Sequence, residues 1–129
     1  MVTKSLAAAE ALAQEGISVE VVDPRTIAPL DVETIVNSVK KTGRLVVVDQ
    51  ATRHASVGAI IAGEVAERGL QHLKAPVKMV TALDTSIPYS EPLEKYVLPN
   101  EEKIIAAVKS VLHEKAGQSE SRKVPASGR

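Results

Sequence analysis

Residues 43–49 read Gly43-Arg44-Leu45-Val46-Val47-Val48-Asp49, and this stretch decides the fold of the chain. Its centre, residues 45–48, is a continuous apolar run without the apolar–polar alternation of a strand that has one face in water. We therefore expect a strand buried on both faces, which requires helices above and below a parallel sheet. A polar loop and a helical pattern that opens at Ser56 follow, so the local unit is strand, loop and crossover helix.

The composition is that of one globular domain. The 129 residues suffice for a single core, and 16 basic and 16 acidic side chains cancel, so neither a nucleic acid nor a membrane is an expected partner. The absence of Cys excludes disulfides and zinc–thiolate sites. No apolar run has membrane-spanning length and the first residues do not resemble a signal peptide, so we expect a cytoplasmic protein.

Helices and strands are predicted to alternate along the chain. A helix is expected over residues 2–15, and Gly16 should end it. Its predicted apolar stripe consists of Val2, Leu6, Ala9 and Ala13. Besides residues 45–48, strands are expected at residues 17–22 and 77–81, where β-branched residues lie next to Pro.

Three further helices are predicted to begin at good capping residues, namely Asp31, Ser56 and Asn100. Their apolar positions recur at helical spacing and include Ile60 in the second and Leu112 in the third. The Pro-rich segment of residues 83–99 should be ordered by packing, with one short helical turn near Leu93. The apolar pattern then stops, so we expect a domain of residues 1–113 and a disordered tail of residues 114–129.

The sequence carries none of the common cofactor motifs. It has neither G-x-G-x-x-G nor a P-loop, and it lacks the Gly-Asp-Gly pattern, followed by Asn, of thiamine diphosphate and magnesium sites. His54, His72 and His113 are scattered, and we interpret them as surface residues. We therefore predict no catalytic residue, no cofactor-binding residue and no metal ligand in this chain.

One loop has two interpretations. Asp49, His54 and Ser56 are the residue types of a nucleophilic triad and follow a buried strand, where α/β folds bind ligands. Arg53 and the helix N-terminus at Ser56 could instead hold an anion. The plainer interpretation, which we favour, is that Asp49 ends the strand, Ser56 caps the helix, and Arg53 and His54 are solvated.

Five segments taken together resemble a known family. They are residues 19–35 (VEVVDPRTIAPLDVETI), 41–49 (KTGRLVVVD), 75–81 (APVKMVT), 87–89 (IPY) and 98–100 (LPN). In this order they are similar to the C-terminal domain of the β subunit of thiamine diphosphate-dependent 2-oxo acid dehydrogenases of the pyruvate, acetoin and branched-chain type. These proteins belong to the transketolase C-terminal domain superfamily. The resemblance covers roughly residues 2–112, and residues 78–90 are most similar to the pyruvate and acetoin enzymes.

The resemblance implies a three-layer α/β/α sandwich on a mostly parallel sheet, which has five strands in the family. It implies a parent enzyme that decarboxylates a 2-oxo acid with thiamine diphosphate and Mg²⁺, which lie outside this domain, so that the isolated chain is inactive. It also implies three partners: the α subunit, a second β subunit and the dihydrolipoyl acyltransferase core, which this domain would help to dock.

The chain departs from the family pattern at three places. The family's loop before the third helix is Gly-rich, whereas residues 52–58 retain only Gly58, and residues 113–129 extend past the last helix of the family. In the family two strands precede the first helix, and this sequence has no counterpart of them. In the family sheet, one of these strands lies between the counterparts of residues 19–22 and 45–48. We therefore expect either that the remaining strands pair directly or that a gap stays open to another chain, and that the isolated chain folds poorly.

Two expectations concern interactions. Ile87, Pro88 and Tyr89 are a candidate interface element, because aromatic side chains often anchor subunit contacts. The alternative is that Tyr89 covers the helix of residues 101–112. The alternatives for the whole chain are a free-standing binding or regulatory module that uses the Arg53 loop, another transketolase-type C-terminal domain, or a fragment with no function of its own.

Overall fold

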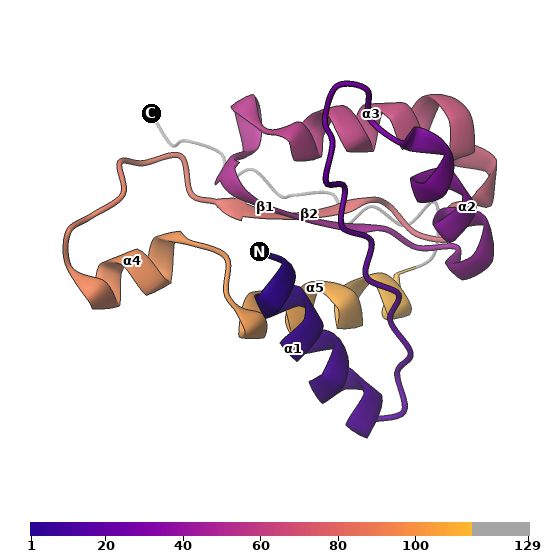
Figure 1. The fold of residues 1–129 in the computed structure, drawn as a ribbon. Coiled ribbons are helices and arrows are strands. Elements are labelled where there is room, and N and C mark those ends of the chain that lie inside the picture. The colour runs from indigo at the N-terminus through magenta and orange to yellow at the C-terminus, as the bar shows by residue number, and fades with distance from the viewer. Residues whose placement is uncertain (115–129) are drawn as a thin grey trace, which may run out of the picture.

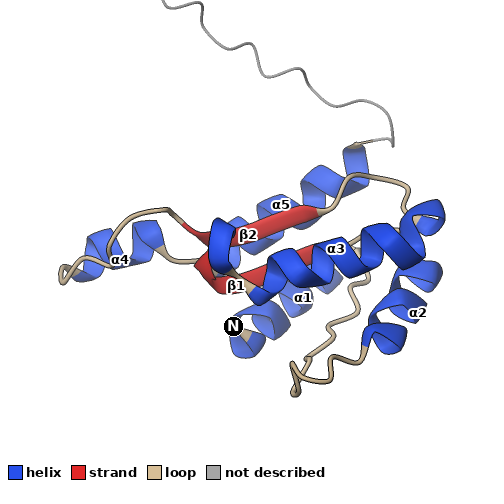
Figure 2. Ribbon diagram, turned by 90° about the horizontal axis from the view of Figure 1, so that it is seen from above, coloured by secondary structure: helices blue, strands red, loops and turns tan. Residues whose placement is uncertain are grey.

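Two parallel strands form the middle layer of the structure, a computed structural model that describes residues 1–114. Two helices cover each face of this small sheet, which gives the predicted α/β/α arrangement (Figures 1 and 2). The strands are β1 (Val46–Thr52) and β2 (Lys78–Ala82); α2 (Val32–Thr42) and α3 (Val57–Gly69) lie on one face, and α1 (Val2–Gln14) and α5 (Glu101–His113) on the other. Two 3₁₀ turns, η1 (Arg53–Ala55) and η2 (Leu70–His72), and helix α4 (Glu91–Val97) complete the elements.

The apolar run of β1 supplies both faces of the sheet. Val47 is buried in a cluster with residues of α2 and α3, whereas Val46 and Val48 pack against the cluster that joins Ala8 of α1 to Ile104 of α5. Because successive side chains of a strand point to opposite faces, a run without polar residues needs cover on both. Val46 and Val48 are nevertheless only half-buried, so the predicted burial on both faces is incomplete.

The predicted helix caps are confirmed. The side chain of Asp31 accepts a hydrogen bond from the backbone N of Thr34 at 3.0 Å, and Ser56 and Asn100 make the equivalent bonds to the third residue of their helices. Bonds from the hydroxyl and the backbone N–H of Thr34 lower the pKa of the Asp31 carboxyl. Gly43 ends α2 in the left-handed conformation, with φ of 74°.

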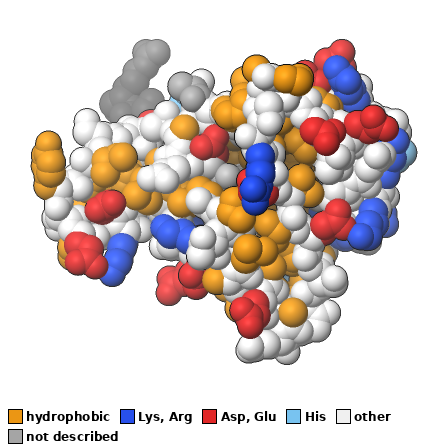
Figure 3. All heavy atoms as spheres, viewed as in Figure 1, with side chains coloured by type: hydrophobic (Ala, Val, Ile, Leu, Met, Phe, Trp, Pro, Cys, Tyr) orange, Lys and Arg blue, Asp and Glu red, His pale blue; other side chains and the backbone are white. Residues whose placement is uncertain are grey.

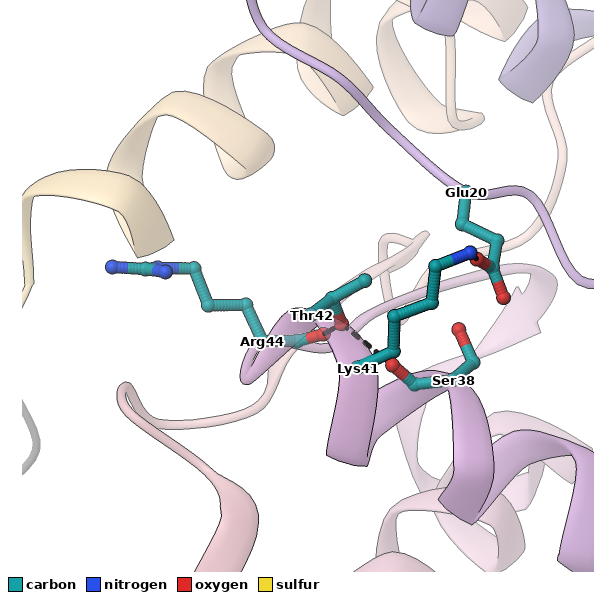
Figure 4. Close-up of polar contacts among 5 residues, drawn as sticks. All are labelled: Glu20, Ser38, Lys41, Thr42 and Arg44. Atoms are coloured by element: carbon teal, nitrogen blue, oxygen red, sulfur yellow. Dashed lines mark hydrogen bonds and ion pairs between the residues drawn. The ribbon is translucent and has the colours of Figure 1, made fainter.

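The strand predicted at residues 17–22 does not form. This segment is extended but pairs with no strand among residues 1–114, and it crosses the layers in front of β1 instead of running beside it (Figure 1). A segment becomes a β-strand only when another strand lies within hydrogen-bonding distance of its backbone. A sequence that favours extended structure is not sufficient by itself. The segment is tied to α2 instead, because Glu20 accepts a hydrogen bond from Lys41 at 2.5 Å, which lowers the pKa of Glu20 (Figure 4).

An apolar gap separates this crossing segment from β1. Two cavities of about 430 and 480 Å³ lie along the open edge of β1, and both are lined by Val19, Val22, Val46 and Val48. Figure 3, which faces this edge, shows hydrophobic side chains gathered across the middle of the surface. Of the two outcomes expected from the sequence, the structure therefore shows the gap and not the direct pairing of strands.

Helix α1 buries a different stripe from the one predicted. Ala8 and Leu12 are its buried residues, whereas Leu6 is 54% exposed and Val2 is also exposed. The helix packs mainly against α5, and this contact selects the positions that face inward. Ile60 and Leu112, which we placed in apolar stripes, are exposed as well.

The predicted tail of residues 114–129 lies outside the described residues except for Glu114, so the domain boundary at residue 113 stays a prediction.

Hydrogen exchange should reveal the open edge of β1. The N–H of Lys78 donates to the carbonyl of Leu45, so alternate amides of β1 point toward β2 and those of Val46 and Val48 point into the gap. We expect the amide of Val47 to exchange much more slowly than its two neighbours in an NMR experiment. Equal protection of all three would mean that the open edge is paired in solution.

Substitution of two glycines in α3 should have opposite effects on stability. A Cβ at Gly58 would lie 2.9 Å from Cγ1 of Val47, whereas a Cβ at exposed Gly63 meets nothing within 4 Å. We expect Gly58→Ala to lower the free energy of unfolding by about 1–3 kcal/mol through overpacking, and Gly63→Ala to raise it by about 0.5–1 kcal/mol. Urea denaturation of both variants tests this, and a neutral Gly58→Ala would contradict the close approach of α3 to β1.

Candidate functional site: the carboxyl end of the sheet

The polar residues singled out in the sequence gather where β1 and β2 end. β1 leads into η1, which carries Arg53 and His54, and β2 leads into the segment that begins at Leu83. His54 and Asp84 join the two, with 2.9 Å between Nδ1 of the imidazole and Oδ2 of the carboxylate. Both side chains are exposed, so this pair contributes little to stability.

Asp49 holds the turn from β1 into α3. One carboxylate oxygen accepts a hydrogen bond from the backbone N of Ala51, and the other accepts one from the backbone N of Gly58, both at 3.0 Å. Gly58 lies in the first turn of α3, where negative charge is favoured by the helix dipole. The carboxylate therefore has a complete structural role at this position.

The three residue types of the candidate triad are not brought together as a triad. Asp49 binds the two amides just described, and the hydroxyl of Ser56 accepts a hydrogen bond from the backbone N of Ala59 at 3.1 Å. His54 pairs with Asp84 rather than with Asp49. Ser56 therefore caps α3 as the plainer interpretation predicts, and His54 is exposed. The prediction that Asp49 ends the strand is wrong, because β1 continues to Thr52 beside β2.

The anion site at Arg53 and Ser56 stays a prediction. The backbone amides of Gly58 and Ala59, which an anion would use at the start of α3, already donate to Asp49 and Ser56. Arg53 lines a shallow cavity on the side of β2, together with Leu83 and Asp84. An anion at the helix N-terminus would therefore have to displace the carboxylate of Asp49.

The most exposed apolar side chains at this end lie on residues 83–99, which we call the arm. The arm includes the candidate interface residues Ile87, Pro88 and Tyr89, and Figure 1 shows it projecting away from the three layers. Tyr89 is fully exposed at 107%, so it does not cover α5, although its role in an interface stays a prediction. Sequence reasoning missed Leu93 and Tyr96, whose i, i+3 spacing in α4 could have revealed a common face.

The base of the arm is well anchored. Val97, Leu98 and Pro99 are buried, and the N–H of Leu83 donates to the carbonyl of Val97 at 3.1 Å. The Lys103 ammonium donates to the carbonyls of Tyr96 and Leu98, and Lys4 of α1 donates to that of Pro99 at 3.0 Å. The domain therefore sets the position of the arm although the outer face of the arm is exposed.

Within residues 1–114, no three His, Asp or Glu side chains are grouped in a way that could hold a metal ion. In that same part of the chain, no helix has the length and apolar character needed to cross a membrane.

Comparison with known proteins identifies the family. The family described as "Transketolase, C-terminal domain" matches residues 1–104, and the chain belongs to this family. A solved structure with the same fold, "Split gene transketolase, inactive beta4 tetramer", has a TM-score of 0.74 and 29% sequence identity and covers 88% of this chain and 36% of its own. The three-layer fold on a parallel sheet agrees with this membership.

Curated relatives place the chain more narrowly. It is 50% identical over 112 residues to "Pyruvate dehydrogenase E1 component subunit beta" of Staphylococcus epidermidis, and the match covers 87% of this chain and 34% of that subunit. The Staphylococcus aureus subunit of the same name is 49% identical with the same coverage. The chain thus spans about a third of the length of these relatives and is homologous to the C-terminal region of pyruvate dehydrogenase β subunits.

Replacement of Asp49 tests its structural role. Asp49→Asn keeps only one acceptor oxygen and removes the charge at the start of α3, so we expect the free energy of unfolding to fall by about 1–2 kcal/mol. His54→Gln, in the exposed ion pair, is the matched control and should change it by less than about 0.5 kcal/mol. Urea denaturation measures both. If the two variants were equally stable, the hydrogen bonds of Asp49 would not hold the turn.

Proposed function

We propose that this chain acts as the C-terminal domain of the β subunit of the decarboxylating component of a pyruvate dehydrogenase complex, where it supports subunit assembly and carries out no chemistry itself. The observation that carries the proposal is the identity of about one half to pyruvate dehydrogenase β subunits, which extends over 87% of the chain. A pyruvate enzyme is favoured over an acetoin enzyme because these relatives carry that name.

The geometry supports a role without catalysis. The polar side chains at the carboxyl end of the sheet, Asp49 and Ser56 above all, are hydrogen-bonded to the backbone around the start of α3. In the proposal, thiamine diphosphate and Mg²⁺ bind elsewhere in the parent enzyme and not to this chain. The Arg53 loop offers no comparable support for a free-standing regulatory module, since the adjacent helix amides are already occupied.

Assembly requires partners. In the proposal these are an α subunit, a second β subunit and the dihydrolipoyl acyltransferase core, to which the domain helps to dock the enzyme. The solved structure of the same fold is named as a tetramer of β chains, which supports contact between copies of this type of chain. The projecting arm offers a surface for such contacts because its outer face is apolar and uncovered.

A chimeric subunit tests the proposal. The matched third of the Staphylococcus epidermidis β subunit is replaced by the corresponding residues of this chain and co-expressed with the α subunit of that organism. We expect the chimera to co-purify with the α subunit and to support pyruvate oxidation with thiamine diphosphate, Mg²⁺ and an artificial electron acceptor. The β subunit without that third is the control and should do neither.

The isolated chain of 129 residues provides the complementary measurement. Calorimetric titration with thiamine diphosphate and Mg²⁺ should give no binding heat, because the sequence lacks the Gly-Asp-Gly motif, followed by Asn, that holds this cofactor. Micromolar binding by the isolated chain would contradict the proposal, as would a folded chimera that does not associate with the α subunit.

A further inference from the structure

The outer edge of β2 is open. Within residues 1–114 the sheet has two strands, so β2 pairs with β1 on one side and with no strand on the other (Figure 2). The N–H of Lys78 donates to the carbonyl of Leu45 beside β1. Because the backbone groups of successive residues in a strand point to opposite sides, those of Met79 and Thr81 point away from β1. These two residues therefore offer N–H and C=O groups to which a further strand can bind.

A shallow cavity runs along this edge, between β2 and α5. It has a volume of about 690 Å³, and on the side of α5 it is lined by the small side chains of Ala106, Ala107 and Ser110. The open stretch ends at Leu83, whose N–H donates to the carbonyl of Val97. The small side chains of α5 therefore leave room beside β2 for one extended segment of the same length as this strand.

Positive charge lines both ends of the cavity. Lys78 lies at the amino end of β2. Arg53 directly follows the last residue of β1, and Lys103 is hydrogen-bonded to the base of the arm, so both lie near the carboxyl end. The acidic residue of the lining, Asp84, is paired with His54. Within residues 1–114 neither Arg53 nor Lys78 forms an ion pair, so both are available to a negatively charged partner.

The spacing of these charges indicates which segment would fit. Lys78, Val80 and Ala82 are alternate residues of β2, and Val80 packs in the cluster of α5 that contains Ala107, so all three face α5. From Lys78 to Ala82 the strand rises by about 13 Å. A strand added to this edge would therefore match the cavity with two carboxylates four positions apart and a small apolar residue midway between them, all facing α5.

We propose that the outer edge of β2 binds an extended acidic segment of another protein, which adds a third strand to the sheet. This inference goes beyond the proposed function and does not depend on it. A basic or uncharged segment is disfavoured because it would leave the ammonium group of Lys78 beside it without a partner. A second copy of the chain is disfavoured as well, since pairing of two β2 edges would bring Lys78 and Arg53 of one copy close to those of the other.

A pair of peptides of opposite charge tests the recognition. The probe is the peptide STEVAVETS with blocked ends, and the control is the same peptide with Lys in place of both Glu residues. Fluorescence anisotropy with the whole chain should show binding of the acidic peptide that is at least about tenfold tighter than that of the basic peptide. Equal binding of the two peptides would overturn the proposal.

Charge reversal on the protein gives the reciprocal measurement. Lys78→Glu should weaken the binding of the acidic peptide by at least about fivefold and strengthen that of the basic peptide. Lys40→Glu, at an exposed residue of α2, is the matched control and should leave both affinities unchanged. Because both residues are exposed, circular dichroism should show the melting temperature of wild type for both variants. An equal effect of the two substitutions would overturn the proposal.

Amide hydrogen exchange of wild type with the acidic peptide bound shows which edge is occupied. We expect exchange at Met79 and Thr81 to become at least about tenfold slower, and exchange at Lys78, which already donates to the backbone beside β1, to change little. Slower exchange at Val46 and Val48 instead would place the peptide in the gap beside β1, and unchanged exchange at both edges would mean that charge alone attracts it. Slower exchange at Met79 and Thr81 that grows with protein concentration without peptide would show a second copy at the edge. Each of these three results would overturn the proposal.

Discussion

The parallel pairing of β1 with β2 is the contact on which the other elements depend. Val46, Val47 and Val48 face Lys78, Met79 and Val80 in register, and this short ladder holds the middle layer together. Because each strand presents apolar side chains to both sides, the pair creates two hydrophobic faces that require helices. The helices α2 and α3 satisfy one face, and α1 and α5 satisfy the other.

The two faces are not equally complete. Val47 is buried in the cluster with α2 and α3, and Gly58 allows α3 to approach the strand closely, although Ile61 of this cluster also lines the gap. On the other face, α1 packs mainly on α5, and Val46 and Val48 stay half-buried beside the gap. A crossing segment of residues 17–24 partly shields this gap but cannot satisfy the edge of β1, because it does not run alongside it.

At the carboxyl end of the sheet, residue types that also occur in catalytic triads make structural hydrogen bonds and an ion pair. A carboxylate, an imidazole and a hydroxyl lie within eight positions of the sequence. Asp49 and Ser56 nevertheless accept hydrogen bonds from backbone amides in the first turn of α3, and His54 pairs with Asp84. Polar groups near a helix start are stabilised by its unpaired amides, which compete for any side chain that catalysis would need. Among residues 1–114, by contrast, nothing covers the apolar side chains of the arm at Leu93 and Tyr96.

The sequence alone determined the fold class, the helix caps and the short helix near Leu93. These features depend on local chemistry: an apolar run must be covered on both faces, and Asp31, Ser56 and Asn100 reach only amides of their own first turn. The sequence also singled out Tyr89, an aromatic residue between prolines, and its role in an interface stays a prediction.

Only the tertiary structure decided which apolar residues are buried and which strands pair. Residues 17–22 have the composition of a strand, but a ladder forms only beside a neighbour, and none lies there. The buried stripe of α1 shifted to Ala8 and Leu12 because α5, and not the sheet, is its main contact. The i, i+3 spacing of Leu93 and Tyr96 indicates a common face, but only the structure shows that this face is exposed while the neighbouring Val97 is buried, since burial depends on neighbours that are distant in the sequence.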